Sequence, residues 1–220
     1  MSPTSCPKPA SSCPSSGEGT VDAGAAHVTV LLRETLDWIG PKPGGRYLDG
    51  TLGLGGHSLG ILRATDGQAE ILGLDRDRQA LALAGERLAP FAGRVHLDNT
   101  SFSGFEAAMD RLNWDALDGA ILDLGVSSLQ LDNAERGFSF SADGPLDMRM
   151  DPGSGFKPAR VLVNKARFEE LRRIIGEYGE EPLAGRIAKA IVREREQAEI
   201  DSTARLAEIV AASRKPLGAM

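Results

Sequence analysis

The chain has 220 residues, of which 41% are hydrophobic, and a formal net charge of −6 at pH 7. These values describe an ordinary globular protein with one core and room for a small second lobe. The negative charge argues against a protein coated in basic surface, although a local basic face is compatible with it. No apolar run reaches the roughly 20 residues of a membrane span, so we expect no membrane partner.

The first 26 residues are rich in Ser, Pro, Gly and Ala, and Lys8 is their one basic residue. Residues 1–26 resemble neither a secretory signal nor an Arg-rich transit peptide, so we expect a disordered tail. Both cysteines, Cys6 and Cys13, lie in this tail, and without nearby histidines they make a poor metal site. We therefore expect no metal centre and a cytoplasmic location, because a folded part without cysteine fits a reducing compartment.

Strand-like and helical segments alternate after a first helical pattern at residues 30–39 and a break at "GPKPGG" (40–45). This alternation predicts parallel βαβ units and an α/β sheet, in which ligands bind beyond the carboxyl ends of the strands. Asp49, Asp75 and Asp123 would all gather there. The predicted strands are 46–49, 70–75, 94–97 and 119–126, and the predicted helices begin near His57 and span 78–89 and 105–112.

The pattern changes after Gly137. Residues 138–158 are loop-like, with Gly, Pro and Asp spread through them. No strand pattern returns before Met220, so either the helices cover the open edge of the last strand or the chain is a fragment. Three amphipathic helices are predicted from the apolar residues Phe168, Leu171, Ile174, Ile175 and Tyr178, then Leu183, Ile187 and Ile191, then Leu206, Ile209 and Val210.

The stretch "YLDGTLGLGGHS" (47–58) nearly satisfies a dinucleotide fingerprint. Gly53, Gly55 and Ser58 take the places of its three small residues, and Asp75 follows 22 residues after Gly53, where an acid can accept hydrogen bonds from ribose. Asp49 discriminates between cofactors, because a carboxylate there would repel a pyrophosphate but favour the cationic groups of S-adenosylmethionine. The alternative is a tight strand-to-helix turn in which Asp49 caps the helix.

Five motifs resemble the cytosine-N4 methyltransferases of small-subunit (16S) ribosomal RNA, the MraW-like family. The resemblance covers about residues 27–213 and implies a Rossmann-like class I methyltransferase core at 27–136, with strand order 3-2-1-4, followed by a loop and α-helical insert at 137–213. It also implies that residues 214–220 are a truncated end. The motifs are "HVTVLLRETL" (27–36), "YLDGTLGLGGHS" (47–58), "GLDRD" (73–77), "LDLGVSSLQLDNAERGFSF" (122–140) and "DGPLDMRMDP" (143–152).

The resemblance also implies the function, which is S-adenosylmethionine-dependent N4-methylation of a cytidine in the decoding region of 16S rRNA within the small ribosomal subunit. Without the resemblance, a polar residue at a helix start is an alternative for His57, and the sequence favours a core position for Phe102. The implied cofactor-binding residues are Gly55, Gly56 and His57 for the methionine part, Asp75 for the ribose, Phe102 for the adenine, and Asp123 and Gln130 for the remaining contacts.

Asp123 is also the candidate catalytic residue. An exocyclic cytosine amine is a poor nucleophile, and a carboxylate that accepts one of its N–H groups would orient it and help it lose a proton. Ser127 and Ser128 are nearby polar partners. The cofactor role of Asp123 competes with this assignment, and a structural cap is a third possibility.

The loop that contains "RGFSF" and "DGPLDMRMDP" carries arginines and aromatic residues. It has no helix or strand periodicity that would explain the aromatic residues as part of a core. It could hold a flipped cytidine, with aromatics on the base and arginines on phosphates, or it could anchor the helical insert. From Lys157 to Gln197 there are ten Lys or Arg and seven Glu, a balance that suits RNA or solvated helix faces equally. The residues concerned in the loop are Arg136, Phe138, Phe140, Asp147 and Arg149.

Two features depart from the family pattern. Leu129 stands where the family usually has proline, and family members continue with further strands beyond the point at which this sequence stops. We therefore keep two alternatives, a non-catalytic fragment that binds cofactor or RNA and, with less support, a nicotinamide-dependent oxidoreductase.

Overall fold

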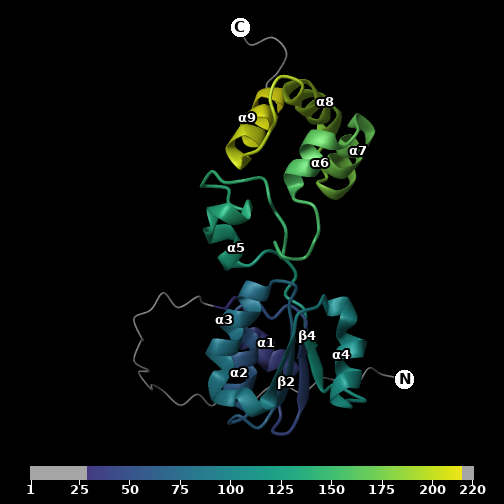
Figure 1. Cartoon of the computed structure of the whole chain (residues 1–220). Coiled ribbons are helices and arrows are strands. Elements are labelled where there is room, and N and C mark those ends of the chain that lie inside the picture. The colour runs from purple at the N-terminus through teal and green to yellow at the C-terminus, as the bar shows by residue number, and fades with distance from the viewer. Residues whose placement is uncertain (1–28, 215–220) are drawn as a thin grey trace, which may run out of the picture.

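The computed structural model describes residues 29–214, so the tail expected at 1–26 and residues 215–220 lie outside the described part of the chain. Figure 1 shows a sheet flanked by helices at one end of the molecule and a group of helices at the other. A short helix, α5 (Ser128–Asp132), and irregular segments lie between the two ends.

The sheet confirms the predicted topology. Its four parallel strands have the order β3-β2-β1-β4, with β1 (Arg46–Asp49) and β2 (Glu70–Leu74) at the centre. Leu48 on β1 lies beside Leu72 on β2 and Ala120 on β4. The outer strands are β3 (Val95–Asp98) and β4 (Gly119–Ile121).

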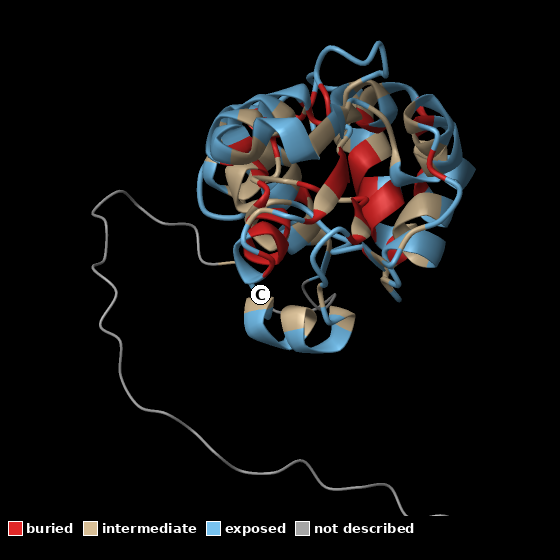
Figure 2. Ribbon diagram, turned by 90° about the horizontal axis from the view of Figure 1, so that it is seen from below, coloured by how far each residue is buried: buried red, intermediate tan, exposed pale blue. Residues whose placement is uncertain are grey.

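Alternating side chains on the strands divide the core into two layers. Tyr47 and Ile71 pack with the helices of one face, whereas Leu48 and Leu72 pack against the helix on the other. Figure 2 shows buried residues gathered where the helices of the core face the sheet. The first face is covered by α1 (Leu32–Ile39), α2 (Gly56–Ala64) and α3 (Arg78–Leu88), and the second by α4 (Phe105–Leu112).

The last strand is shorter than the predicted segment 119–126. β4 ends at Ile121, after which Leu122, Leu124 and Val126 are exposed. The backbone N–H of Asp123 donates to Thr51 Oγ1 at 2.7 Å, which turns the chain across the end of β1. The apolar residues of this stretch therefore belong to a loop beside the strand ends, which hydrophobicity alone could not distinguish from a buried strand.

The carboxyl-terminal helices have a core of their own, formed by residues such as Leu171, Ile187 and Ile209. The three predicted helices are present, but two short helices, α5 and α6, were not predicted. Tyr178 does not belong to an apolar face: it is exposed, and its hydroxyl accepts a hydrogen bond from Arg173. The helices are α6 (Ala159–Lys165), α7 (Phe168–Arg173) with a π-helical continuation (Ile174–Tyr178), α8 (Ala184–Arg195) and α9 (Thr203–Arg214).

Candidate cofactor cleft

A cleft of about 470 Å³ lies beyond the carboxyl ends of β1, β2 and β4. This is the edge at which parallel α/β sheets bind their ligands. Its walls come from the glycine loop after β1, the segment after β2, the 3₁₀ turn η2 (Phe102–Gly104), and the segment that leads from β4 into α5. Of the sequence-predicted cofactor residues, the cleft brings together Gly56, His57, Asp75, Phe102, Asp123 and Gln130.

The glycine loop has a conformation that other residues adopt with difficulty. Gly53 and Gly55 have φ angles of 52° and 72°, in the left-handed region. Gly55 is buried, and a Cβ on it would lie 3.1 Å from the side chain of Leu88. A Cβ on Gly56 would lie 1.9 Å from Thr29 Oγ1. These Cβ positions face neighbouring side chains, so the packing of the loop requires glycine at 55 and 56. Gly53 and Gly56 line the cleft.

Asp75 stands at the rim of the cleft directly after β2, as predicted. Its Oδ2 accepts a hydrogen bond from the backbone N–H of Gly53 at 2.8 Å, and its Oδ1 accepts one from Asp77 N–H at 2.8 Å. These two bonds fix the carboxylate between the glycine loop and the start of α3. Each oxygen has a second lone pair, so the group can still accept hydrogen bonds from a ligand.

Asp49 does not line the cofactor cleft, although the sequence predicted it close to the ligand. The side chain is 2% exposed and does not line the cleft. Its Oδ2 accepts from Ser58 Oγ at 2.7 Å, and its Oδ1 has no hydrogen-bond partner among the described residues. Burial raises the pKa of the carboxyl, against the opposing effects of Ser58 and of the nearby His57. Any effect of Asp49 on a ligand therefore acts through the loop rather than by contact.

The two ring-bearing candidates differ in how firmly they are held. His57, in the first turn of α2, makes a hydrogen bond between Nε2 and the carbonyl oxygen of Val30 at 3.1 Å. Phe102 is 42% exposed and lies beside Gly50, where a Cβ would come within 3.0 Å of the phenylalanine Cβ. Phe102 is thus a ring at the cleft wall and not a core residue.

Asp123 and Gln130 occupy contrasting environments. Asp123 is exposed at the cleft, with Ser127 and Ser128 also among the lining residues. Gln130 is 4% exposed, and its amide is already engaged at both ends. Its Oε1 accepts from Ser127 N–H at 3.1 Å, completing a capping box, and its Nε2 donates to Asp77 Oδ2 at 3.1 Å. The structure thus gives Gln130 a role in holding α5 in place beside the cleft.

A buried ion pair, which the sequence did not reveal, ties the segment after α5 to the core. Arg136 Nη1 lies 2.8 Å from Asp77 Oδ2, and both side chains are almost fully buried. The same arginine donates to the carbonyl oxygens of Arg149 and Met150, while its Nε has no partner among the described residues. Arg136 is therefore a structural clamp and does not reach outward to phosphates.

The other predicted loop residues divide between structure and surface. Arg149 pairs with Asp147 through two nitrogens and also donates to the carbonyl of Pro152. This arrangement lowers the pKa of Asp147, chiefly through the arginine hydrogen bond. Phe140 is fully exposed and Phe138 partly so. Leu146 is buried in the helical core, so the loop also anchors the insert.

Over residues 29–214, no group of three or more His, Cys, Asp or Glu side chains is placed to hold a metal ion. In the same range, no helix has the length and apolar character needed to cross a bilayer.

The parallel sheet in the order β3-β2-β1-β4, with a glycine loop after β1 and an acid after β2, is the fold of the Rossmann-like class I methyltransferases. The model of the MraW methylase family matches residues 24–217, and the chain belongs to this family.

Similar proteins carry the name ribosomal RNA small subunit methyltransferase H. That of Maridesulfovibrio salexigens is 61% identical over 184 residues, which cover 84% of this chain and 57% of that protein. That of Oleidesulfovibrio alaskensis is 58% identical over 185 residues, with the same two coverages. The chain thus spans 57% of the length of these relatives. The solved structure of P. horikoshii TYW2 in complex with MeSAdo is similar over 72% of this chain and 56% of that chain, at 16% identity and a TM-score of 0.33, too low to support an inference.

Proposed function

We propose that this chain forms the cofactor-binding core of an S-adenosylmethionine-dependent methyltransferase. Its substrate is 16S ribosomal RNA within the small ribosomal subunit, and its target is the N4 amine of a cytidine in the decoding region. Membership of the MraW methylase family and the names of the relatives support the enzyme class and the rRNA substrate. The observation that carries the cofactor assignment is Asp75, fixed by two backbone N–H groups at the rim of the cleft.

The residues at the cleft fit this cofactor. Gly53 and Gly56 line the cleft without side chains, and together with His57 they border the space for the methionine part. Asp75 offers acceptor lone pairs to the ribose hydroxyls, and the exposed ring of Phe102 offers an apolar surface to adenine. Asp49, buried beneath the loop, accepts a hydrogen bond from Ser58 and supports the loop without lining the cleft.

When bound, S-adenosylmethionine supplies an electrophilic methyl group. The protein's contribution is then to hold the acceptor amine in line and away from water. Asp123, exposed at the cleft beside Ser127, is placed to accept one N–H of the cytosine amine and so to orient its lone pair. Gln130 and Arg136 have a positioning role. Both side chains donate to Asp77 and thereby hold α5 and the following loop beside the cleft.

An Asp123→Asn variant tests whether Asp123 serves the amine or the cofactor. Asparagine keeps the size of the side chain but cannot take up a proton, so we expect methyl transfer to fall by about 100-fold or more while S-adenosylmethionine affinity changes little. Transfer of labelled methyl to small ribosomal subunits and calorimetric titration give the two numbers. Asp132→Asn, an exposed position on α5, is the matched control. Loss of cofactor affinity, with an unchanged transfer rate at saturating S-adenosylmethionine, would show that Asp123 binds the cofactor and does not serve the amine.

A further inference from the structure

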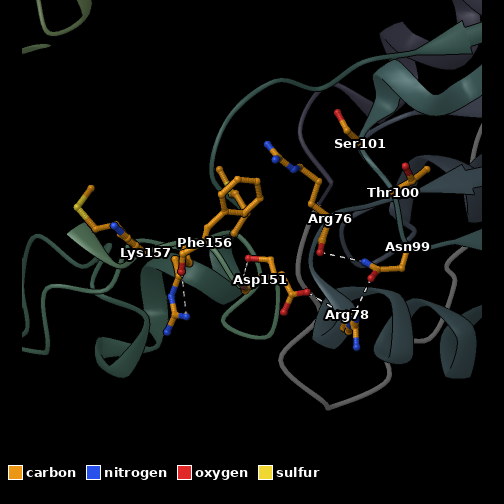
Figure 3. Close-up of a pocket in the computed structure, with 12 residues that line it drawn as sticks. Arg76, Arg78, Asn99, Thr100, Ser101, Asp151, Phe156 and Lys157 are labelled. Carbon is orange, nitrogen blue, oxygen red and sulfur yellow. Dashed lines mark hydrogen bonds and ion pairs between the residues drawn. The ribbon is translucent and has the colours of Figure 1, made fainter. Parts of the chain in front are cut away.

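A second cleft, of about 390 Å³, adjoins the first and shares Arg76 and Met150 with it. One wall consists of the segments that follow β2 and β3, and the other of the loop that returns from α5 toward α6 (Figure 3). Four cationic side chains and one carboxylate line this cleft, in a chain whose net charge is −6. The charged members are Arg76, Arg78, Arg149, Lys157 and Asp151.

A hydrogen-bond network joins the two walls of the second cleft. Arg78 Nε donates to Asn99 Oδ1 at 3.0 Å and lies 3.3 Å from Asp151 Oδ2. Asn99 Nδ2 in turn donates to the carbonyl oxygens of Asp75 and Arg76. These contacts join the two walls, and the carboxylate of Asp151 compensates the charge of Arg78.

At the mouth of the cleft, in contrast, the cationic side chains have no carboxylate partner in the described part of the chain. The guanidinium of Arg76 lies 5.7 Å from the centre of the Phe156 ring, and the two side chains point toward one another across the gap (Figure 3). Phe156 is 63% exposed, so its ring is accessible to a ligand. Within residues 29–214, no carboxylate forms an ion pair with Arg76 or with the neighbouring Lys157. An exposed ring thus lies against the guanidinium of Arg76 and next in sequence to Lys157, and neither cation has an ion-pair partner among the described residues.

We infer that this second cleft binds one nucleotide of single-stranded RNA, next to the nucleotide presented at the cofactor cleft. Phe156 offers a stacking surface for the base, and Arg76 and Lys157 offer charge to the flanking phosphates. An exposed ring beside cations without ion-pair partners suits a polynucleotide, because each nucleotide carries a flat π-face and an anion. This inference rests on the proposed RNA substrate, and it adds residues that neither the motifs nor the cofactor site includes.

The test measures binding of a fluorescein-labelled, single-stranded RNA dodecamer to the chain by anisotropy. Phe156→Ala should weaken binding by about 5- to 150-fold, the usual effect of removing one stacked base contact. Phe156→Trp should preserve the affinity, since indole stacks as well as phenyl. Lys157→Ala should lower the slope of log affinity against log salt by about 0.7, the value for one phosphate contact on a single strand.

Two exposed side chains away from the cleft serve as matched controls, Trp38 on α1 for the aromatic and Arg63 on α2 for the cation. Their alanine variants should leave RNA affinity unchanged. S-adenosylmethionine affinity of Phe156→Ala should equal that of the unmodified chain, and its circular dichroism shows whether it folds. Unchanged RNA affinity in a Phe156→Ala/Lys157→Ala double variant, or equal losses in the controls, would overturn the inference while leaving the cofactor site intact. Absence of RNA binding by the unmodified chain would overturn the inference, and methyl transfer to small ribosomal subunits then shows separately whether the proposed function stands.

Discussion

Arg136 and Asp77 form a buried ion pair across 59 residues of sequence, with 2.8 Å between Nη1 and Oδ2. Asp77 also accepts the backbone N–H of Gln79 as the N-cap of α3, and its own N–H donates to Asp75. Asp77 therefore connects the proposed ribose acid through its backbone N–H, and the start of α3 and the loop after α5 through its carboxylate. This connection explains how the loop keeps its place beside the cleft.

Replacing Arg136 with methionine should lower the free energy of unfolding by about 3–5 kcal/mol, because it leaves the Asp77 charge buried without a partner. The double variant Asp77→Asn/Arg136→Met should lose less than the sum of the single changes, since asparagine keeps the helix cap without the charge. Urea denaturation monitored by tryptophan fluorescence measures each value. Arg205→Met, in an exposed ion pair, is the control and should cost at most about 1 kcal/mol. Equal effects of the two Arg→Met changes would show that the buried pair is not a clamp.

The raised pKa of Asp49 predicts a specific pH dependence of stability. The folded state holds the proton more tightly than the unfolded chain does, so the contribution of Asp49 is complete below the unfolded pKa of about 3.9. It is lost as the pH rises through the folded pKa. The free energy of unfolding of the unmodified chain, minus that of Asp49→Asn, should therefore decrease with rising pH above 4. Parallel pH profiles for the two proteins would contradict the burial cost assigned to this carboxylate.

The left-handed conformation of Gly55 should make it intolerant of a side chain. Gly55→Ala introduces a positive-φ alanine whose Cβ would lie 3.1 Å from Leu88, and we expect a loss of about 1–2 kcal/mol in the free energy of unfolding. Gly93 has no atom within 4 Å of its virtual Cβ and no positive φ, so Gly93→Ala should change stability by less than about 0.5 kcal/mol. Thermal unfolding of the two variants gives the comparison. A Gly55→Ala protein as stable as Gly93→Ala would mean that the loop adapts.

The sheet was predictable because each βαβ unit carries a local signal. The strand at 46–49 and the helix at 105–112 have the predicted bounds, since an apolar strand next to a turn and a 3.6-residue period need no distant partner. The helix α6 was missed because its seven residues are too few for a periodic pattern. Leu122 and Val126 were wrongly assigned to a strand, because an apolar residue exposed in a loop has the same hydrophobicity as one buried in a strand.

The candidate site was predictable in its position but not in its hydrogen bonds. Asp75 and Asp123 reach the cleft because the carboxyl ends of parallel strands share one edge. The hydrogen bonds of the other site residues join positions far apart in sequence. Asp49 binds a side chain 9 residues away, and Gln130 and Arg136 bind a side chain 53 and 59 residues away. No periodicity encodes such contacts. The pair of acids in "GLDRD" was nevertheless a usable signal, because two carboxylates so close together must find different partners.

Calorimetry of the chain tests most directly whether the cleft beyond β1, β2 and β4 binds S-adenosylmethionine through Asp75. We predict saturable binding of S-adenosylmethionine at one site, no binding of NAD at the same concentrations, and a loss of about 1.5–3 kcal/mol in binding free energy for Asp75→Ala, the range for hydrogen bonds to a charged group. Asp66→Ala, an exposed acid in the turn after α2, should bind as the unmodified chain does. Saturable NAD binding, or full affinity for S-adenosylmethionine in a folded Asp75→Ala protein, would contradict this account.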